Sequence, residues 1–284
     1  MARIFPICSS SSANATFIGT KGHGILIDAG CSFRALKNSL ELIDTSMSQI
    51  EALFITHEHI DHVKGLLQLT KHTNIPIFSS TGTIQALRRD VRETIPEEVR
   101  IYDVLHEPYQ SADFEVTAFH TPHDTPESVG YVVKYAGKKI AVCTDLGKLT
   151  AEVEKNLLGC EAVLLESNYD PAMLAKNLNY STDLKRRIAG EKGHLSNNAA
   201  AEMAAKLVAS GTTKLILGHL SRENNTPATA EKCTEDHLHS KGMHRNKDYI
   251  LETAPVMTQG MYIVIKEVHY HQAHRYVEVQ RRRA

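Results

Sequence analysis

The segment Ala52-Leu53-Phe54-Ile55-Thr56-His57-Glu58-His59-Ile60-Asp61-His62 restricts the fold and the chemistry of this chain more than any other stretch. Its apolar first part predicts a buried β-strand. Four side chains that can bind metal follow it: His57, His59, Asp61 and His62. A strand end fixes the backbone, and the turn after it points successive side chains in different directions. Two of the four can therefore serve one metal ion and two its neighbour, which predicts a dinuclear site.

The donor atoms limit which metals fit this site. Imidazole and carboxylate together suit zinc, manganese or iron, whereas calcium takes oxygen ligands alone. The alternative, a polar surface turn, requires four ligand-type residues to fall within six positions by chance. We therefore expect two divalent metal ions (Zn, Mn or Fe) as cofactors.

The composition of the 284 residues restricts the class of partner. Lys plus Arg (32) and Asp plus Glu (33) nearly cancel, so nucleic acid can bind only at a local basic patch. The five cysteines form no CxxC pair and are odd in number, which argues against a disulfide framework and a zinc knuckle. We find no signal-peptide pattern and no apolar stretch of membrane-spanning length, and we expect a cytoplasmic protein that does not bind membranes.

Strands and helices alternate along the chain, and polar clusters follow the strands. This order predicts a layered α/β sandwich with helices outside the sheets and one site built from loops at a common edge. We expect a single domain over residues 1–284 that ends in a short flexible tail. The predicted strands cover residues 4–8, 15–18, 24–27, 52–55, 114–119, 129–135, 139–143, 162–165 and 214–217, and the predicted helices cover residues 33–42, 63–70 and a segment that starts at 196 or 197.

Several polar segments have no clear place in this pattern. Residues 230–248 are hard to place, and we expect His237, His239 and His244 within them to lie on the surface. We expect the same of His269 and His271, although their i, i+2 spacing could also bind a metal. The run Arg281 to Arg283 is most simply part of the tail.

The segment Thr56 to His62 resembles the HxHxDH signature of the metallo-β-lactamase superfamily. Other motifs of that superfamily follow in order: Asp28 resembles the first, and His123, Asp145 and His219 resemble the third, fourth and fifth. The resemblance implies a four-layer αββα sandwich and extends over the whole chain. It is closest to the YycJ/WalJ-type group, whose members are thought to be nucleases. The matching segments are Cys8 to Asn14, His123-Asp124 before Val129-Gly130-Tyr131, Leu165 to Asn168, and Lys192 to Asn197.

The resemblance implies a role for each ligand. One metal takes His57, His59 and His123, the second takes Asp61, His62 and His219, and Asp145 bridges them. Asp28 supports the metal loop without binding metal. Water held between two cations is acidified, so metal-bound hydroxide is the expected nucleophile.

Two neighbouring residues leave alternatives open. His120 competes with His123 for the third motif, because His120 to Pro126 is also similar to a thioesterase-type TPxHT pattern; we favour His123, which directly precedes an acidic residue. Cys143 lies two residues before Asp145, and we expect it in the core. A bridging aspartate at Asp145 favours phosphodiesterases and thioesterases over antibiotic hydrolysis.

Glu166 and His194 match by placement a pair in ribonuclease Z, in which a glutamate contacts a histidine that assists the leaving oxygen. A carboxylate beside an imidazole raises the imidazole pKa and fixes its orientation, which suits a general acid. We expect Asp61, Glu166 and His194 to be catalytic. The alternative is that Glu166 ends a strand and His194 caps a helix without a shared role.

The expected substrate contacts come from two segments. In the run Lys185-Arg186-Arg187, Lys185 and Arg186 could contact flanking phosphates, or they could form a solvated helix face. Residues 9–12 and Asn14 could hold a terminal phosphate, or they could form a hairpin turn. The full set that we expect to bind substrate is Ser10, Ser11, Asn14, Asn168, Lys185 and Arg186.

Together these features predict a dinuclear metal-dependent phosphodiesterase, specifically a DNA exonuclease with 5′ to 3′ direction. DNA ends or single strands are the expected partners, because the chain has no room for a large cap domain. The rivals are a thioesterase or lactonase with the same metals and a non-catalytic binding protein. The sequence leaves the oligomeric state open.

Overall fold

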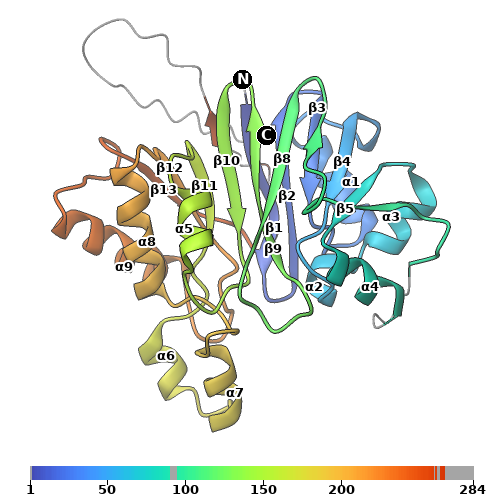
Figure 1. Cartoon of the computed structure of the whole chain (residues 1–284). Coiled ribbons are helices and arrows are strands. Elements are labelled where there is room, and N and C mark those ends of the chain that lie inside the picture. Colours follow the sequence, from blue (N-terminus) through green and yellow to red (C-terminus); the bar gives the residue numbers. More distant parts are fainter. Residues whose placement is uncertain (1, 90–94, 259, 261–262, 266–284) are drawn as a thin grey trace, which may run out of the picture.

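Two twisted β-sheets face each other in this computed structural model, which describes residues 2–89, 95–258, 260 and 263–265 (Figure 1). The first sheet has the strand order β14-β1-β2-β3-β4-β5-β6 and the second β13-β12-β11-β10-β9-β8-β7. The strands of the first are β1 (Ala2–Ser10), β2 (Ala13–Thr20), β3 (His23–Ile27), β4 (Ile50–Phe54), β5 (Ile77–Ser79), β6 (Ile101–Asp103) and β14 (Ile263–Ile265). Those of the second are β7 (Tyr109–Gln110), β8 (Phe114–His120), β9 (Val129–Tyr135), β10 (Lys138–Cys143), β11 (Ala162–Glu166), β12 (Lys214–Gly218) and β13 (Ile250–Thr253).

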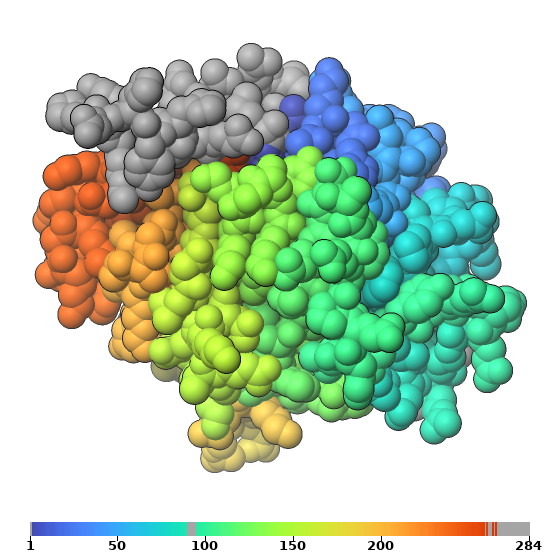
Figure 2. Space-filling view, turned by 45° about the horizontal axis from the view of Figure 1, so that its top comes forward, coloured from blue at the N-terminus to red at the C-terminus, as the bar shows by residue number. Residues whose placement is uncertain are grey.

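Helices cover the outer face of each sheet. Beside the first sheet lie α1 (Phe33–Glu41), α2 (Ile60–Val63), α3 (Leu66–His72) and α4 (Thr81–Arg89), with a short 3₁₀ turn at Met47–Gln49. Beside the second lie α5 (Ala151–Leu157), α8 (Asn197–Ala209) and α9 (Pro227–Ser240). Two short helices, α6 (Pro171–Lys176) and α7 (Thr182–Ile188), project from one end of the sandwich (Figure 1). The segment around α7 also stands out at the bottom of the space-filling view (Figure 2).

Three apolar layers hold the four structural layers together, and β11 shows how a strand serves two of them. Ala162 and Leu164 pack between the sheets, whereas Val163 and Leu165 pack against α5, α8 and α9. The period of two in a strand sends alternate side chains to opposite faces, so an uninterrupted apolar run is buried on both sides. The third layer lies between the first sheet and helices α1, α3 and α4. The predicted αββα sandwich is confirmed.

The structure also corrects the sequence prediction at the element level. The predicted helix over 63–70 is two helices, α2 and α3, which meet at Lys64 and Gly65. Residues 230–248, which sequence alone leaves unplaced, contain most of α9, because Ala230, Thr234 and Leu238 form a buried i, i+4, i+8 stripe among polar neighbours. The weakly patterned middle of the chain contains β5, α4, β6 and β7, none of which sequence alone predicts.

Several predictions concern the surface and the ends. His239 and His244 are exposed and His237 is half-buried, in line with the surface prediction. Residues His269, His271 and Arg281 to Arg283 lie outside the described part of the chain. Of the helices that the structure describes, none combines the length and apolar character required to cross a bilayer. The single domain and the cytoplasmic location stay predictions.

Candidate metal centre and active site

The ends of several strands bring the candidate residues to one edge of the sandwich. In the second sheet, β10, β11 and β12 run parallel to one another, and β8 runs in the same direction because β9, which lies between β8 and β10, is antiparallel to both. The carboxyl ends of these four strands therefore lie at this edge. The first sheet contributes β3 and β4, which are parallel to each other. Residues just past these strands form the candidate site: Asp28 after β3, His57 after β4, His123 after β8, Asp145 after β10, Glu166 at the end of β11 and His219 after β12.

Three of these residues have a left-handed backbone. The φ angles of Asp28, Asp145 and His219 are 62°, 60° and 54°, a region that residues other than glycine rarely adopt. All three residues directly or closely follow a strand. Strained backbone of this kind gathers at functional sites, where the surrounding packing holds it.

Of the four overlapping groups of potential ligands among the described residues, two match the expected triads. The ligating atoms of His57, His59 and His123 lie within 4.8 Å of one another, and so do those of Asp61, His62 and His219. Asp145 joins the groups, since its Oδ2 lies 3.2 Å from His62 Nε2 and its Oδ1 lies 3.7 Å from His123 Nε2. The seven residues that the sequence singles out as ligands are thus brought together in two triads and a carboxylate that reaches both.

The buried histidines share one pattern of hydrogen bonding through Nδ1. The Nδ1 atoms lie close to a protein partner: 2.8 Å from Asp28 Oδ2 for His62, 2.9 Å from Glu166 Oε1 for His219, 3.0 Å from the Gly193 carbonyl for His123 and 3.0 Å from Thr56 Oγ1 for His57. A partner at Nδ1 fixes the ring and favours the tautomer that leaves Nε2 free as a metal ligand. The four rings are therefore set to bind through Nε2.

The donor atoms fit a metal ion. His57 Nε2 is buried and has no hydrogen-bond partner among the described residues. His219 Nε2 and Asp145 Oδ2 also lack a hydrogen bond of good geometry, although they lie near Asp61 and His62. Buried polar atoms without partners are costly, and a cation would satisfy these.

The electrostatics of the cluster favour positive charge. Burial disfavours the charged imidazolium, but Asp145, Asp61 and Glu166 outweigh it and raise the pKa of His219 to about 10. Burial of Asp61 is likewise outweighed by His62 and His219, which hold the pKa of Asp61 well below its usual range. Carboxylates gathered in a buried site create the field that a divalent cation neutralises.

Glu166 and His194 form a hydrogen-bonded pair next to this cluster. His194 Nδ1 lies 2.8 Å from Glu166 Oε1, and Glu166 is fully buried. The other oxygen, Oε2, accepts the backbone N–H groups of Leu146 and Leu195. Burial works against the charged ring, but the Glu166 carboxylate outweighs it and raises the pKa of His194. Glu166 also accepts His219 Nδ1, so one carboxylate orients a ring of the cluster and the ring of His194.

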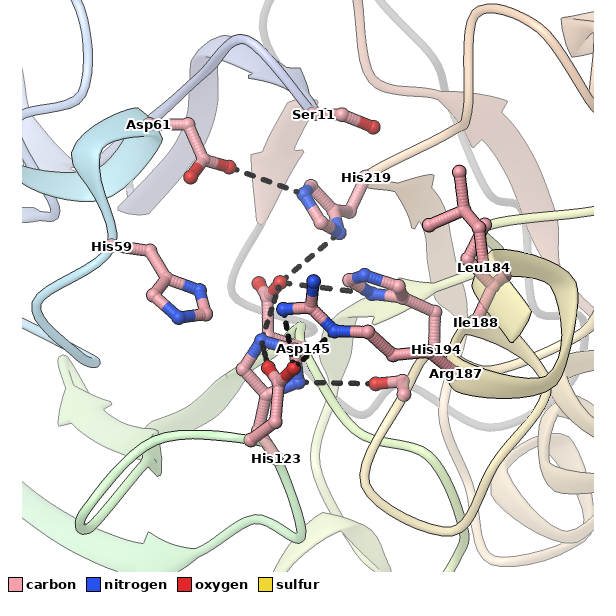
Figure 3. A pocket seen from close by; sticks show the side chains of 12 residues that line it. Ser11, His59, Asp61, His123, Asp145, Leu184, Arg187, Ile188, His194 and His219 are labelled. Atoms are coloured by element: carbon pink, nitrogen blue, oxygen red, sulfur yellow. Dashed lines mark hydrogen bonds and ion pairs between the residues drawn. The ribbon is translucent and has the colours of Figure 1, made fainter. Parts of the chain in front are cut away.

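A small pocket opens onto both groups. Its volume is about 200 Å³, and His59, Asp61, His123, Asp145, His194 and His219 line it together with Ser11, Asp124, Leu184, Arg187, Ile188 and Gly193. Figure 3 shows Asp61 and Ser11 on one side and the side chains of α7 on the other. The pocket is thus closed on one side by the projecting helix.

The serine segment is a hairpin turn whose members differ in position. It connects β1 and β2, and Ser11 lines the pocket while Ser10 is fully buried. Asn14 Nδ2 donates to Asp61 Oδ2 at 3.1 Å and lies 3.0 Å from His62 Nε2. Asn168 is buried too, and its Nδ2 donates to the His219 carbonyl at 2.7 Å. Of the residues expected to bind substrate, Ser10, Asn14 and Asn168 are thus buried and do not line the pocket, and their contacts can position other residues.

The basic run on α7 is oriented differently from the expectation. Lys185 Nζ donates to the Ala175 carbonyl and Arg186 pairs with Asp183, and neither lines the pocket. Arg187 does, with its Nε 2.7 Å from Asp124 Oδ2. The position of a residue around the helix decides which member of the basic run lines the pocket.

The structure distinguishes the two candidates for the third motif, His120 and His123. His120 is exposed, with its Nδ1 3.3 Å from Glu152, whereas the His123 ring centroid lies 5.1 Å from those of His57 and His59. Cys143 is fully buried in the core beside α5 and α8.

Known proteins share the sequence and the fold of this chain. It is 29% identical over 252 residues to the exodeoxyribonuclease YycJ of Bacillus anthracis, which covers 88% of this chain and 95% of the relative. It is 27% identical to the exodeoxyribonuclease WalJ of Streptococcus pneumoniae, over 88% of this chain and 93% of the relative. The predicted resemblance to this group is confirmed, and these relatives are consistent with a metal-dependent hydrolase.

The solved structure of Zn²⁺-bound PqqB from Methylobacterium extorquens aligns with a TM-score of 0.66 at 15% identity, over 93% of this chain and 100% of that one, which shows a common fold. The family described as "Beta-lactamase superfamily domain" matches residues 23–220. The chain therefore belongs to the metallo-β-lactamase superfamily.

Proposed function

We propose that the protein is a dinuclear metal-dependent phosphodiesterase that acts as a DNA exonuclease in the 5′ to 3′ direction. One observation carries the proposal: His194, which is hydrogen-bonded to the buried Glu166, lines the same pocket as members of the two groups of potential ligands. An alkoxide leaving group needs a proton, and a histidine beside a carboxylate can supply it.

The distances within the cluster support the ligand roles that the resemblance implies. His57, His59 and His123 would hold one divalent ion, Asp61, His62 and His219 the other, and Asp145 would bridge the two ions. Two such ions, when bound, acidify water and neutralise charge on the phosphate oxygens. Zinc, manganese and iron all suit these donors.

The chain's own groups do the remaining work. Asp61 faces the pocket as an ionised carboxylate and can orient the attacking water. His194, held through Nδ1 by Glu166, gives its Nε2 proton to the departing sugar oxygen. Asp28 and Glu166 keep the rings of His62 and His219 in the orientation that metal binding requires.

The relatives support the choice of substrate. The similar proteins from Bacillus anthracis and Streptococcus pneumoniae are named exodeoxyribonucleases, and the match extends over nearly their whole length. The pocket, of about 200 Å³, has room for a phosphodiester at a strand end. The 5′ to 3′ direction rests on the resemblance to this group.

A substitution of the proposed acid tests the mechanism. We expect His194→Ala to lower kcat on 5′-phosphorylated single-stranded DNA by about 10² to 10⁴-fold, since general acid catalysis contributes that much. On bis(p-nitrophenyl) phosphate the loss should be below about tenfold, because p-nitrophenolate leaves without a proton. Metal content should be unchanged. The control is His239→Ala, which removes an exposed histidine on α9 that does not line the pocket.

Other results would contradict the proposal. Equal losses on both phosphodiesters would mean that His194 does not act as the acid. Cleavage of a thioester or lactone alone by the metal-loaded wild-type protein would identify an esterase instead, and no cleavage of any ester would identify a binding protein. Labels at the 5′ and 3′ ends of the DNA report the direction.

A further inference from the structure

Helix α7 differs from the long helices of the sandwich in where its apolar side chains lie. None of its seven residues is buried. Leu184, Arg187 and Ile188 nevertheless line the pocket, and their i, i+3, i+4 spacing places them on one face of the helix (Figure 3). An amphipathic helix ordinarily packs its apolar stripe on a core, as α8 does. The apolar residues of α7 face the pocket instead, so a ligand with an apolar part would cover them.

Arg187 supplies the charge that complements this face. Among the residues that line the pocket it is the one guanidinium or ammonium group, beside the carboxylates Asp61, Asp124 and Asp145. Asp124 holds it at 2.7 Å through Nε, yet 66% of the Arg187 side chain is exposed. Of the five N–H donors of a guanidinium, those not directed at Asp124 have no partner among the described residues and can reach a phosphate oxygen.

The position of α7 relative to His194 is fixed by backbone contacts. The Ile188 carbonyl accepts the His194 N–H at 2.8 Å. A Cβ on Gly193 would lie 2.2 Å from both the Arg187 and the Ile188 carbonyl oxygens, so only glycine permits this approach. The same Gly193 accepts His123 Nδ1 through its carbonyl. The α7 face therefore stands at a set distance from the proposed acid and from one group of ligands.

We infer that the inner face of α7 is a nucleotide subsite. Leu184 and Ile188 contact the base of the nucleotide whose phosphate is attacked, and Arg187 contacts the next phosphate along the strand. This inference rests on the proposed phosphodiesterase function. It extends that function because it explains how the protein would bind a DNA strand more tightly than a small phosphodiester. It also assigns the phosphate contact to Arg187 in place of Lys185 and Arg186.

Inhibition of a small substrate tests the base contact. In the hydrolysis of methyl p-nitrophenyl phosphate by the metal-loaded protein, thymidine 5′-monophosphate should inhibit at least about tenfold more tightly than inorganic phosphate, as burial of one apolar side chain implies. Leu184→Ser should remove most of that difference and leave the inhibition constant of phosphate unchanged. The control is Leu178→Ser, which changes a leucine that is 97% exposed between α6 and α7.

Salt dependence tests the contact of Arg187. We expect Arg187→Ala to raise KM for single-stranded DNA about tenfold while kcat/KM for methyl p-nitrophenyl phosphate stays within about twofold. The slope of log KM against log salt should fall by about 0.7, which corresponds to one lost phosphate contact. Arg187→Lys should restore part of the affinity, and Lys176→Ala is the control for an exposed cation of the same projecting segment.

The outcomes separate the two proposals. If the wild-type protein hydrolyses no phosphodiester, the proposed function fails. If it does, but the nucleotide binds no more tightly than phosphate, the subsite alone is wrong. If Arg187→Ala lowers metal content or impairs both substrates equally, Arg187 acts through Asp124 on His123 and the subsite is again wrong. Because α7 buries no side chain, these variants should fold.

Discussion

At the residue scale, Asp28 connects the backbone of Thr56 to the imidazole ring of His62. Its Oδ1 accepts the Thr56 N–H at 2.8 Å, and its Oδ2 lies 2.8 Å from His62 Nδ1. Burial raises the pKa of Asp28, against the opposing effect of His62 and Thr56. The carboxylate thus holds the backbone of Thr56 and the ring of His62 at once.

This arrangement predicts the effect of Asp28→Asn. Asparagine tolerates the left-handed backbone at φ 62° and has the same shape, so the fold should persist. It lacks the negative charge that fixes the His62 tautomer, and we expect affinity for the second metal ion to fall about 10 to 100-fold. Competition titration with a chelating dye measures the affinity, and circular dichroism checks the fold. Unchanged affinity in a folded variant would refute this role.

At the element scale, the turn between β9 and β10 carries a residue that does not suit its backbone. The turn is Ala136-Gly137, with φ angles of 49° and 71°, between the paired residues Tyr135 and Lys138. Two positive φ angles in a two-residue hairpin define a type I′ turn, which favours Asn-Gly. Gly137 meets this demand and Ala136 does not.

We therefore expect Ala136→Asn to stabilise the protein. Relief of a left-handed alanine should raise the free energy of unfolding by about 1 kcal/mol, and the melting temperature by roughly 2 °C. Activity should be unchanged, since β9 and β10 meet here at the edge opposite to the site. Differential scanning calorimetry measures the shift. The branched Ala136→Val should lower the melting temperature, and a rise with valine would contradict the backbone explanation.

At the scale of the whole molecule, a polar clasp joins the two sheets at the end away from the site. His23 on β3 lies 2.6 Å from Glu51 on β4 and 3.2 Å from Asp113 just before β8. Tyr109 on β7 donates its hydroxyl to Glu51. Burial disfavours the Glu51 carboxylate, but hydrogen bonds from Ser111, Tyr109 and His23 outweigh it and lower the pKa of Glu51.

The sign of this shift fixes a pH dependence. A carboxyl whose pKa is depressed below its usual value of 4.5 contributes stability above that pH and loses it as the pH falls through the folded pKa. We expect wild type to melt above Glu51→Gln at pH 7 and the difference to shrink below pH 4.5. Thermal melts of both proteins at equal metal content measure it. A difference that stays constant over this range would exclude the ionised clasp.

The sequence predicted much of the site because much of it is local. Four candidate ligands occur within six positions after one strand, and Asp145, Glu166 and His219 each follow an apolar run that is recognisable by its length. The residues that hydrogen-bond to the rings of these histidines are harder to predict from the sequence. Thr56 and the Gly193 carbonyl contact ring nitrogens through geometry that no spacing rule contains.

The sequence by itself determined the class of fold, because periodicity and motifs are properties of short segments, and the resemblance to the metallo-β-lactamase superfamily implied the expected ligands and the Glu166 and His194 pair. The tertiary structure decided which residues reach the pocket. Ser11 lines it and Ser10 does not, and Arg187 faces it while Lys185 and Arg186 face away. Side chains that are neighbours in sequence point in different directions on a turn or a helix. Only the packing of β12, α7 and residues 56–62 at one sheet edge decides which of these side chains face the pocket.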